Sequence, residues 1–218
     1  PNLARQHPAD YIRGAEEVLR SVLKEAASRR KSFQAQQVIG IGVDTTGSTP
    51  IPVDRQGTPL AMHRKFDRNA DAMAWLWKDH TSIAEADEIT ALAREMRPEY
   101  LAKCGGSYSS EWFFSKVLHC LRSTPKVFEA AWSWVELADW IPAVLTGDTC
   151  PEQITPGICP AGYKALYSDD WGGWPDEDFL GALAPELAEL RRRLPPKAEP
   201  IGTRAGGLSS EWSKRTGL

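Results

Sequence analysis

The stretch Val38-Ile-Gly-Ile-Gly-Val-Asp44 decides the fold class of this 218-residue chain. A short apolar run bounded by polar residues is typical of a strand buried on both faces, as in a parallel sheet flanked by helices. Small polar residues and glycine follow from Asp44 to Thr49. In open α/β sheets, ligands bind at the carboxyl ends of the strands. We therefore expect a ligand-binding crevice at residues 44–49.

Helical and extended patterns alternate around this strand. Residues 51–62 contain a turn between two extended runs, which predicts a hairpin and hence a mixed sheet. Residues 72–77 predict a second strand that ends in polar residues before a helix, with the buried start of a helix as the alternative. Prolines weaken the pattern from residue 195 onward, so we expect a domain over 1–194 and a linker over 195–218. The other expected elements are a strand at 132–136 and helices at 10–30, 82–96, 110–121, 137–145 and 176–193. The last of these helices is interrupted or restarted around Pro185, and a short helix begins with Pro125 in its first turn.

Composition excludes several classes of protein. Apolar residues make up 42% of the chain and charged residues 25%, as in ordinary globular domains. Lys plus Arg is 26 and Asp plus Glu is 29, so the formal charge is 26 − 29 = −3, which argues against a nucleic-acid partner. No apolar stretch approaches the roughly 20 residues that a membrane span needs. We therefore expect a cytoplasmic protein with neither nucleic acid nor membrane as its partner.

Common metal and cofactor motifs are missing from the sequence. The four cysteines form no C-x-x-C pair, and the four histidines have no metal-ligand spacing. Neither a P-loop nor a dinucleotide fingerprint is present, and no G-x-S-x-G elbow occurs. We expect reduced structural thiols, no metal site and no cofactor-binding residue in this chain. The nine tryptophans point weakly to a polyol or aromatic ligand.

Two groups of polar residues at strand ends remain as candidates for a site. Each has an ordinary structural explanation: Asp44 and Thr46 can cap a turn, and Trp77 can belong to the core. Lys78 and Asp79 can form a solvated pair. From spacing alone we infer a crevice and no reaction. The groups are Asp44, Thr46, Gly47 and Ser48 after the first strand, and Trp77, Lys78, Asp79 and His80 after the second.

Six segments, in order along nearly the whole chain, resemble the FGGY family of carbohydrate kinases, above all its members that act on ribulose. Trp77-Lys-Asp-His-Thr81 together with Cys159-x-Ala-Gly-x-Lys164 is more typical of those members than of the xylulose or glycerol kinases. The segments are 38–50, 76–81, 105–113, 139–147, 159–164 and 170–173.

The resemblance implies an actin-like, ribonuclease-H-like first domain that binds a ketopentose. It implies a C-terminal domain of the same protein that binds ATP with Mg²⁺. The implied reaction is ATP-dependent phosphorylation of L-ribulose to L-ribulose 5-phosphate in L-arabinose breakdown.

The resemblance also assigns residues to the sugar. Gly47 matches a strand-end residue whose backbone faces the sugar, and Thr46 precedes it. Trp77 would pack on the carbon chain, with Asp79 beside it, and Lys164 would donate hydrogen bonds to sugar oxygens. The expected substrate-binding residues are therefore Thr46, Gly47, Trp77, Asp79 and Lys164.

Family members differ from this chain at both ends. They open with a strand that carries an Asp-Phe-Gly-type phosphate turn, and this sequence begins after it. Their catalytic Asp lies in a Gly-rich segment that we expect beyond Leu218, so no catalytic residue is predicted here. We expect an incomplete domain that lacks its first strands and has no kinase turnover by itself. Its uncovered sheet edge favours a homodimer or aggregation.

Two rival functions remain open from the sequence. One is another FGGY kinase that acts on xylulose, D-ribulose or another polyol. The other is a non-catalytic carbohydrate-binding module that kept the sugar pocket and lost the transfer machinery.

Overall fold

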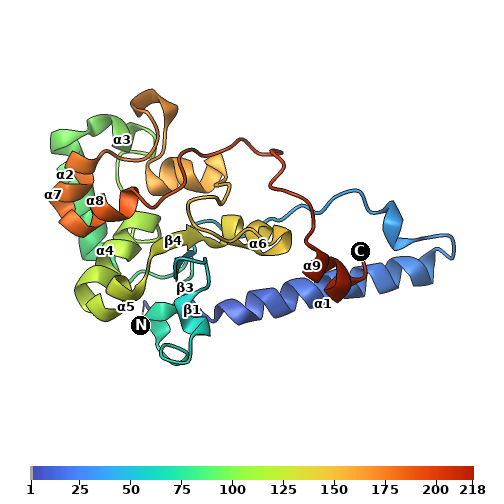
Figure 1. The fold of residues 1–218 in the computed structure, drawn as a ribbon. Coiled ribbons are helices and arrows are strands. Elements are labelled where there is room, and N and C mark those ends of the chain that lie inside the picture. Colours follow the sequence, from blue (N-terminus) through green and yellow to red (C-terminus); the bar gives the residue numbers. More distant parts are fainter. Residues whose placement is uncertain (1) are drawn as a thin grey trace.

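Two short antiparallel sheets lie at the centre of the computed structural model, which describes residues 2–218 (Figure 1). Strand β1 (Arg5–Gln6) pairs with β3 (Ala74–Trp75), with Arg5 opposite Trp75. Strand β2 (Pro50–Val53) pairs with β4 (Ser133–Glu136), with Pro50 opposite Glu136. β2 and β4 are buried at every position, so this pair is a core element.

Helices surround the two sheets and make the fold helix-rich. Most begin or end where the sequence predicts; α5 and α8, for example, start with proline in the first turn, where its missing N–H costs nothing. The α-helices are α1 (Pro8–Arg29), α2 (Ile83–Met96), α3 (Pro98–Ala102), α4 (Phe113–Ser123), α5 (Pro125–Ala130), α6 (Leu137–Thr146), α7 (Glu177–Leu183), α8 (Pro185–Arg191) and α9 (Ser210–Thr216). Single turns of 3₁₀-helix lie at Ala35–Gln37, Leu60–Met62, Ala70–Ala72 and Asp169–Trp171, and Pro160–Lys164 is a π-helix.

The apolar core has two parts. The larger cluster packs α2, α4, α7 and α8 around buried side chains such as Trp75, Phe114 and Leu187. The smaller cluster joins β2, β4 and α6 through side chains such as Ile51, Val135 and Trp140. The β2–β4 sheet thus borders both clusters, since Trp134 of β4 belongs to the larger one.

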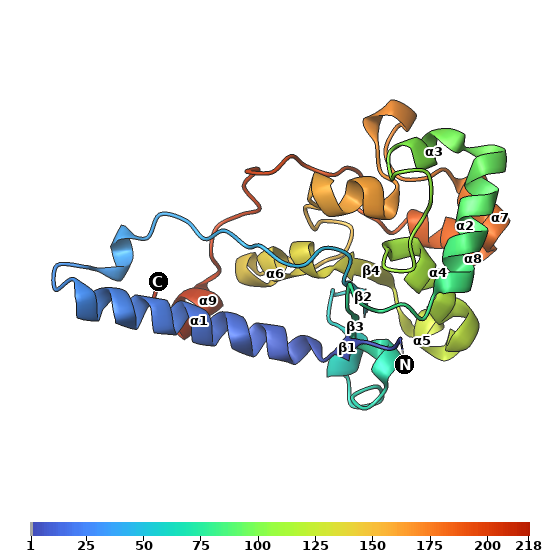
Figure 2. The same ribbon diagram turned by 180° about the vertical axis from the view of Figure 1, so that it is seen from behind.

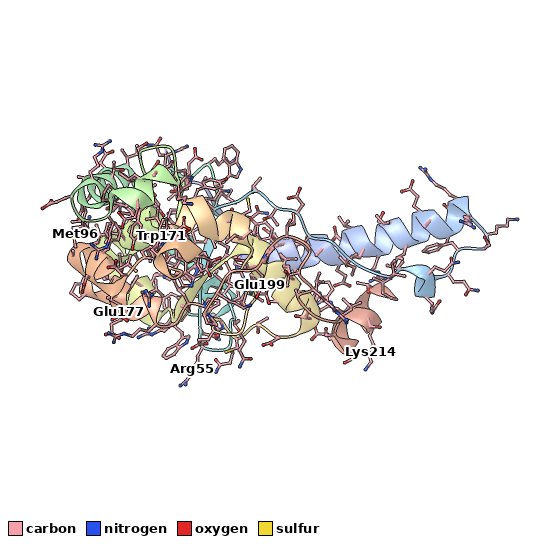
Figure 3. All side chains as sticks on the ribbon, turned by 90° about the horizontal axis from the view of Figure 1, so that it is seen from above. Arg55, Met96, Trp171, Glu177, Glu199 and Lys214 are labelled. Atoms are coloured by element: carbon pink, nitrogen blue, oxygen red, sulfur yellow. The ribbon has the colours of Figure 1, made fainter. Side chains whose placement is uncertain are left out.

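Helix α1 projects away from the body (Figure 3). Nδ1 of His7 accepts a hydrogen bond from the Ala9 amide and caps its first turn. Its first half packs on the smaller cluster, whereas Val18 and Val22 are exposed. Helix α9 lies on α1, with an ion pair of 2.6 Å between Arg215 and Glu16. The helix predicted over 10–30 is confirmed.

Residues 195–218, expected to be a linker, include the helix α9. Trp212 on this helix is buried in the smaller cluster, and Ser209 caps its start. The sequence showed no apolar block there because the segment joins the smaller cluster through a single buried tryptophan and the partly buried Leu208. The domain boundary after residue 194 stays a prediction.

The buried strand predicted at residues 38–44 is wrong for the described residues. The segment runs from the tip of α1 back to the body without joining a sheet (Figure 2). Ile39 is fully exposed, and Val38, Ile41 and Val43 are also exposed. An apolar run becomes a buried strand only where neighbouring strands and helices cover it, and residues 2–218 place none there.

Two other strand predictions need shortening. Of residues 72–77, only Ala74–Trp75 form a strand, and a turn follows directly. The hairpin expected in 51–62 closes tightly at Gly57, whose φ is +78°, and Val53 bridges Pro59 before a 3₁₀ turn begins. Pro59 has no N–H to extend the ladder, which explains the short second arm.

The α/β fold class is confirmed, with small sheets that helices flank. Both named sheets are antiparallel, because the segment expected to add a parallel strand stays unpaired. None of the helices described here is both long enough and apolar enough to cross a lipid bilayer.

Candidate functional site

Gly47 and Lys164, two of the predicted sugar-binding residues, lie against each other although they are far apart in the sequence. A β-carbon added to Gly47 would fall 1.7 Å from Lys164 Nζ and 3.0 Å from its Cε. Real β-carbons do not approach other atoms so closely, so the tip of Lys164 occupies the space that a side chain at position 47 would need. The ammonium group therefore lies over the backbone of the Gly47 turn.

A π-helix and a buried tyrosine hold Lys164 in this place. Lys164 ends the π-helix Pro160–Lys164, a kind of turn that is rare and often marks functional sites. The hydroxyl of Tyr108 donates a hydrogen bond to the Lys164 carbonyl and accepts one from the Phe114 amide at 3.0 Å. Burial raises the pKa of Tyr108 well above its ordinary value, so the hydroxyl keeps its proton. The 105–113 motif thus contacts Lys164.

Lys116 on α4 connects the Gly47 turn with the turn that carries Trp77. Its Nζ donates to the Ser48 carbonyl at 2.8 Å and to the Leu76 carbonyl at 2.9 Å. These carbonyls belong to the residue after Gly47 and the residue before Trp77. The side chain of Trp77 is 44% exposed, so it has free surface for a ligand. Gly47, Lys164 and the Trp77 turn therefore meet in one region.

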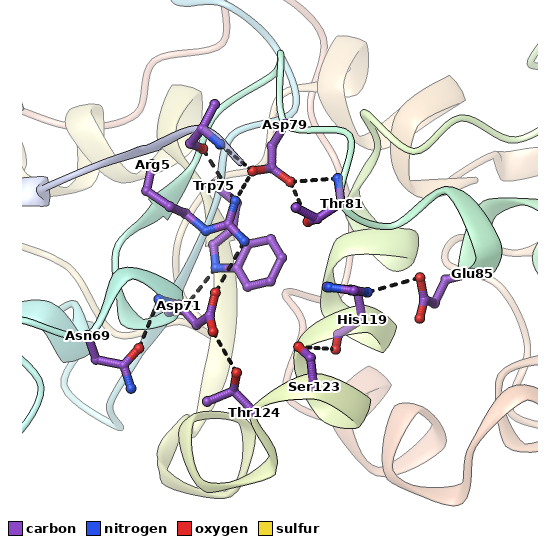
Figure 4. A network of polar contacts seen from close by, with 11 residues as sticks. Arg5, Asn69, Asp71, Trp75, Asp79, Thr81, Glu85, His119, Ser123 and Thr124 are labelled. Atoms are coloured by element: carbon purple, nitrogen blue, oxygen red, sulfur yellow. Dashed lines mark hydrogen bonds and ion pairs between the residues drawn. The ribbon is translucent and has the colours of Figure 1, made fainter. Parts of the chain in front are cut away.

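Asp79 turns away from solvent and binds protein groups (Figure 4). One of its oxygens accepts from the Ala4 amide at 2.6 Å and from the Arg5 guanidinium. The other accepts from the Thr81 amide at 3.1 Å and from the Thr81 hydroxyl at 2.6 Å. This carboxylate therefore holds the turn after Trp77 against strand β1.

Arg5 completes this network beneath the turn. Its guanidinium stacks on the ring of Trp75, 3.3 Å from the centroid, and pairs with Asp71 at 3.3 Å (Figure 4). Burial lowers the pKa of Arg5, and the two carboxylates, first Asp79 and then Asp71, oppose that shift. A buried charge with two carboxylate partners fixes its neighbours firmly, since losing one partner is costly.

Glu136 at the end of β4 holds the other side of the Gly47 turn. Its Oε2 accepts from the Thr49 amide at 2.7 Å, and the Leu137 amide donates to the Thr49 carbonyl at 3.1 Å. Burial raises the pKa of Glu136, while Lys116, the Thr49 amide and Lys164 oppose the shift. The Glu136 carboxyl group thus lies near two lysines, Lys116 and Lys164, that both reach the turn.

A second buried carboxyl, Asp139, lies one helical turn further on. Its Oδ1 accepts from the Gly157 amide at 2.9 Å, and burial raises its pKa to about 8. Glu136 and Asp139 both line a cavity of about 30 Å³, together with Ala161 of the π-helix. That volume suits about one water molecule.

Thr46 and Asp44, the remaining polar residues of the predicted crevice, are exposed at the rim. Ser48 adopts φ +65°, an uncommon conformation for a residue other than glycine. This sharp turn aims the Ser48 carbonyl at Lys116. Among the described residues no three His, Cys, Asp or Glu side chains gather as they would around a metal ion.

Curated proteins named ribulokinase resemble almost the whole chain. The ribulokinase of Vibrio parahaemolyticus serotype O3:K6 is 43% identical over 215 residues, which are 98% of this chain and 37% of that protein. The ribulokinase of Shouchella clausii is 39% identical over 219 residues, which are 100% of this chain and 37% of that protein. The chain thus spans slightly more than a third of the length of these relatives. No protein-family model matches it.

Solved structures of sugar and polyol kinases share the fold. Plasmodium falciparum glycerol kinase with ADP superposes with a TM-score of 0.72 at 16% identity, over 98% of this chain and 38% of that one. Ligand-bound xylulose kinase from Lactobacillus acidophilus gives 0.70 at 15% identity, over 100% and 38%. These structures show the shared fold. The ribulokinase relatives and the six motif segments show that the chain belongs to the FGGY family of carbohydrate kinases.

Proposed function

We propose that this chain forms the sugar-binding part of an ATP-dependent kinase that converts L-ribulose to L-ribulose 5-phosphate. The observation that carries the proposal is the ammonium of Lys164 over the Gly47 turn. The ribulokinase relatives, at up to 43% identity, favour ribulose over the substrates of other kinases in the family.

Each residue of the proposed sugar site has a distinct task. The Lys164 ammonium supplies three donors for sugar oxygens. Gly47 lets the sugar approach the backbone closely, because a side chain there would compete with the lysine. The exposed face of Trp77 covers the carbon chain of the sugar, and an indole suits this task because it is apolar and rigid.

Thr46 and Asp79 serve the same site differently. The Thr46 hydroxyl lies at the exposed rim, where it can bind a sugar oxygen. Asp79 acts from behind: its hydrogen bonds to Ala4 and Thr81 hold the turn that presents Trp77. We therefore propose that Asp79 positions the binding surface.

Phosphoryl transfer depends on placing the sugar hydroxyl in line with the γ-phosphate, so positioning supplies much of the acceleration. The residues described here bind and orient the sugar. ATP, Mg²⁺ and the base that accepts the hydroxyl proton belong, in our proposal, to a further part of the same protein.

The test uses the complete natural protein that carries this chain. ATP consumption is measured with L-ribulose, D-ribulose, D-xylulose and glycerol, and we expect the highest kcat/KM with L-ribulose. A higher value with another substrate assigns the protein to a different kinase of the family. Sugar binding without ATP consumption in this complete protein identifies a binding module.

The 218-residue chain is assayed in parallel. We expect it to produce no L-ribulose 5-phosphate above a matched blank, because half of the transfer machinery is supplied elsewhere in our proposal. Turnover by this chain alone contradicts that division of tasks.

A further inference from the structure

Lys116 is a charged side chain in the interior of the protein. It lies on α4 with no exposed surface, and its neighbours Val117 and Leu118 on the helix are core residues. Burying an ammonium costs several kcal/mol unless it is paired and hydrogen-bonded. An apolar side chain would fill the same space at a lower cost, so the charge calls for an explanation.

The contacts of the ammonium supply that explanation. Nζ donates to the Ser48 and Leu76 carbonyls at 2.8 and 2.9 Å and lies 3.5 Å from the Trp75 carbonyl. Ser48 lies two residues before β2, and Leu76 directly follows β3, so no sheet ladder of the described residues reaches these two carbonyls. The Leu76 carbonyl also accepts from the Asp79 amide at 2.9 Å. The ammonium, with three donors, reaches both carbonyls at once and so links them.

We propose that Lys116 is a positioning residue of the sugar site, which sets the separation between the Gly47 turn and the Trp77 turn. This inference rests on the proposed function, because those two turns carry Gly47 and Trp77 of the proposed sugar site. Both carbonyls bind the same nitrogen, so neither turn moves independently of the other.

The surrounding charges support a protonated Lys116. Burial lowers the pKa of its ammonium, whereas Glu136 and then Asp79 oppose this shift. Glu136 also holds the Thr49 amide, and Asp79 holds the turn after Trp77. The two carboxylates that stabilise the ammonium thus each hold one of the two turns that it joins.

The main test compares Lys116→Met with Val117→Ala in the complete natural protein. Methionine keeps the volume and removes the donors. Val117→Ala weakens the same helix without touching either carbonyl, because Val117 packs in the larger cluster. We expect Lys116→Met to raise the KM for sugar by about 10- to 100-fold, as small misplacements in a site do, with the KM for ATP unchanged. Val117→Ala should leave both KM values unchanged.

A second variant, Lys116→Gln, keeps part of the donor capacity and should fall between wild type and Lys116→Met. Hydrogen exchange of this variant should increase at residues 48–49 and 76–78 together, but not within α2. Equal sugar KM values in Lys116→Met and Val117→Ala, or faster exchange at only one turn, overturn the inference.

If both Lys116 variants fail to fold while Val117→Ala folds, Lys116 serves the core alone, and the inference is overturned as well. The wild type separates this inference from the proposed function. No turnover of L-ribulose by the wild type refutes the proposed function, whereas an active wild type with an unaffected Lys116→Met refutes only the inference.

Discussion

Residues 38–44 and strand β2 flank the Gly47 turn and are similarly apolar, yet they have opposite fates. β2 pairs with β4 over its whole length, and Ile51 and Val53 are completely buried. Residues 38–44 have the same extended appearance in the sequence, but Ile39 is fully exposed and no strand of the described residues pairs with them. The turn is therefore anchored on one side only.

The side of the Gly47 turn that continues into β2 is held by side chains from several other elements. Lys116, Glu136 and Lys164 all reach the turn or the residues just after it, and each comes from a different element. Residues 38–44 lack such neighbours in this structure. An apolar pattern thus gives a segment the capacity to form a strand, and its neighbours decide whether it does.

The largest expected effect tests this difference with one substitution at two positions. Ile51→Ala should lower the free energy of unfolding by about 2–5 kcal/mol, because it leaves a cavity in the core. Ile39→Ala should change it by less than about 0.5 kcal/mol, because the side chain is exposed. Urea denaturation of the 218-residue chain measures both, and equal losses would break the comparison.

Lys164→Ala tests whether the anchored side of the turn is the side that binds sugar. We expect kcat/KM for L-ribulose in the complete protein to fall by the equivalent of about 2–5 kcal/mol, as for a truncated buried charge, if bound sugar desolvates this half-buried lysine in the closed cleft. Lys103→Ala is the matched control, since Lys103 forms a surface ion pair with Asp170. An unchanged kcat/KM in Lys164→Ala would remove this lysine from the site.

Asp139 tests the electrostatics behind the anchored side. Its pKa is about 8 in the folded protein and about 4 in an unfolded chain. The folded state therefore keeps a proton that the unfolded state releases, so stability falls as the pH rises between these values, by up to about 1.4 kcal/mol per pH unit.

Asp139→Asn should remove this fall, because asparagine cannot ionise and its oxygen can still accept from Gly157. The variant should have a flatter stability profile and exceed the wild type most at about pH 8. Unfolding curves at several pH values measure this, and parallel profiles of wild type and variant would speak against a buried neutral Asp139.

Trp77→Ala tests whether the neighbouring turn also contacts the sugar. Loss of the exposed indole face should raise the KM for L-ribulose by about 10-fold, the equivalent of about 1.4 kcal/mol of apolar contact, and leave kcat nearly unchanged. Steady-state kinetics of the complete protein gives both values. A loss of stability with normal kinetics would assign Trp77 to packing.

The smallest expected effect concerns the turn itself. Ser48→Gly should change stability by at most about 1 kcal/mol in the stabilising direction, because glycine adopts φ +65° without strain but loses more entropy on folding. Ser48→Ala keeps the strained backbone and should not gain stability. Thermal unfolding compares them, and a gain in Ser48→Ala alone would point instead to the buried hydroxyl, which has no partner in the described structure.

Local pattern predicted many of the elements correctly. Helix α2 begins directly after Ser82, as the pattern Ser82-x-x-Glu85 predicts. The break between α7 and α8 falls at Pro185, since proline starts a helix more readily than it continues one. The strand predicted at 38–44 was wrong because strand pairing depends on segments that are distant in the sequence. None of the described residues pairs with 38–44. The π-helix that ends at Lys164 has no pattern of its own.

The Gly47–Lys164 contact was expected only through the resemblance, and the structure shows it. Lys116 was missed, although it left a signal: it lies three residues after Phe113 and four before Cys120, on the apolar face of its helix. A lysine at such a position must find acceptors inside the protein. The sequence does not reveal which carbonyls those are.

The amino-acid sequence by itself determined the fold class, most helices and the polar turn after β3, because these depend on side-chain spacing and turn chemistry. Only the tertiary structure decided that Lys116 ties two turns together, that Asp79 faces inward, and that residues 38–44 lie uncovered. Such outcomes depend on contacts between segments distant in the chain, and local sequence patterns do not specify those contacts.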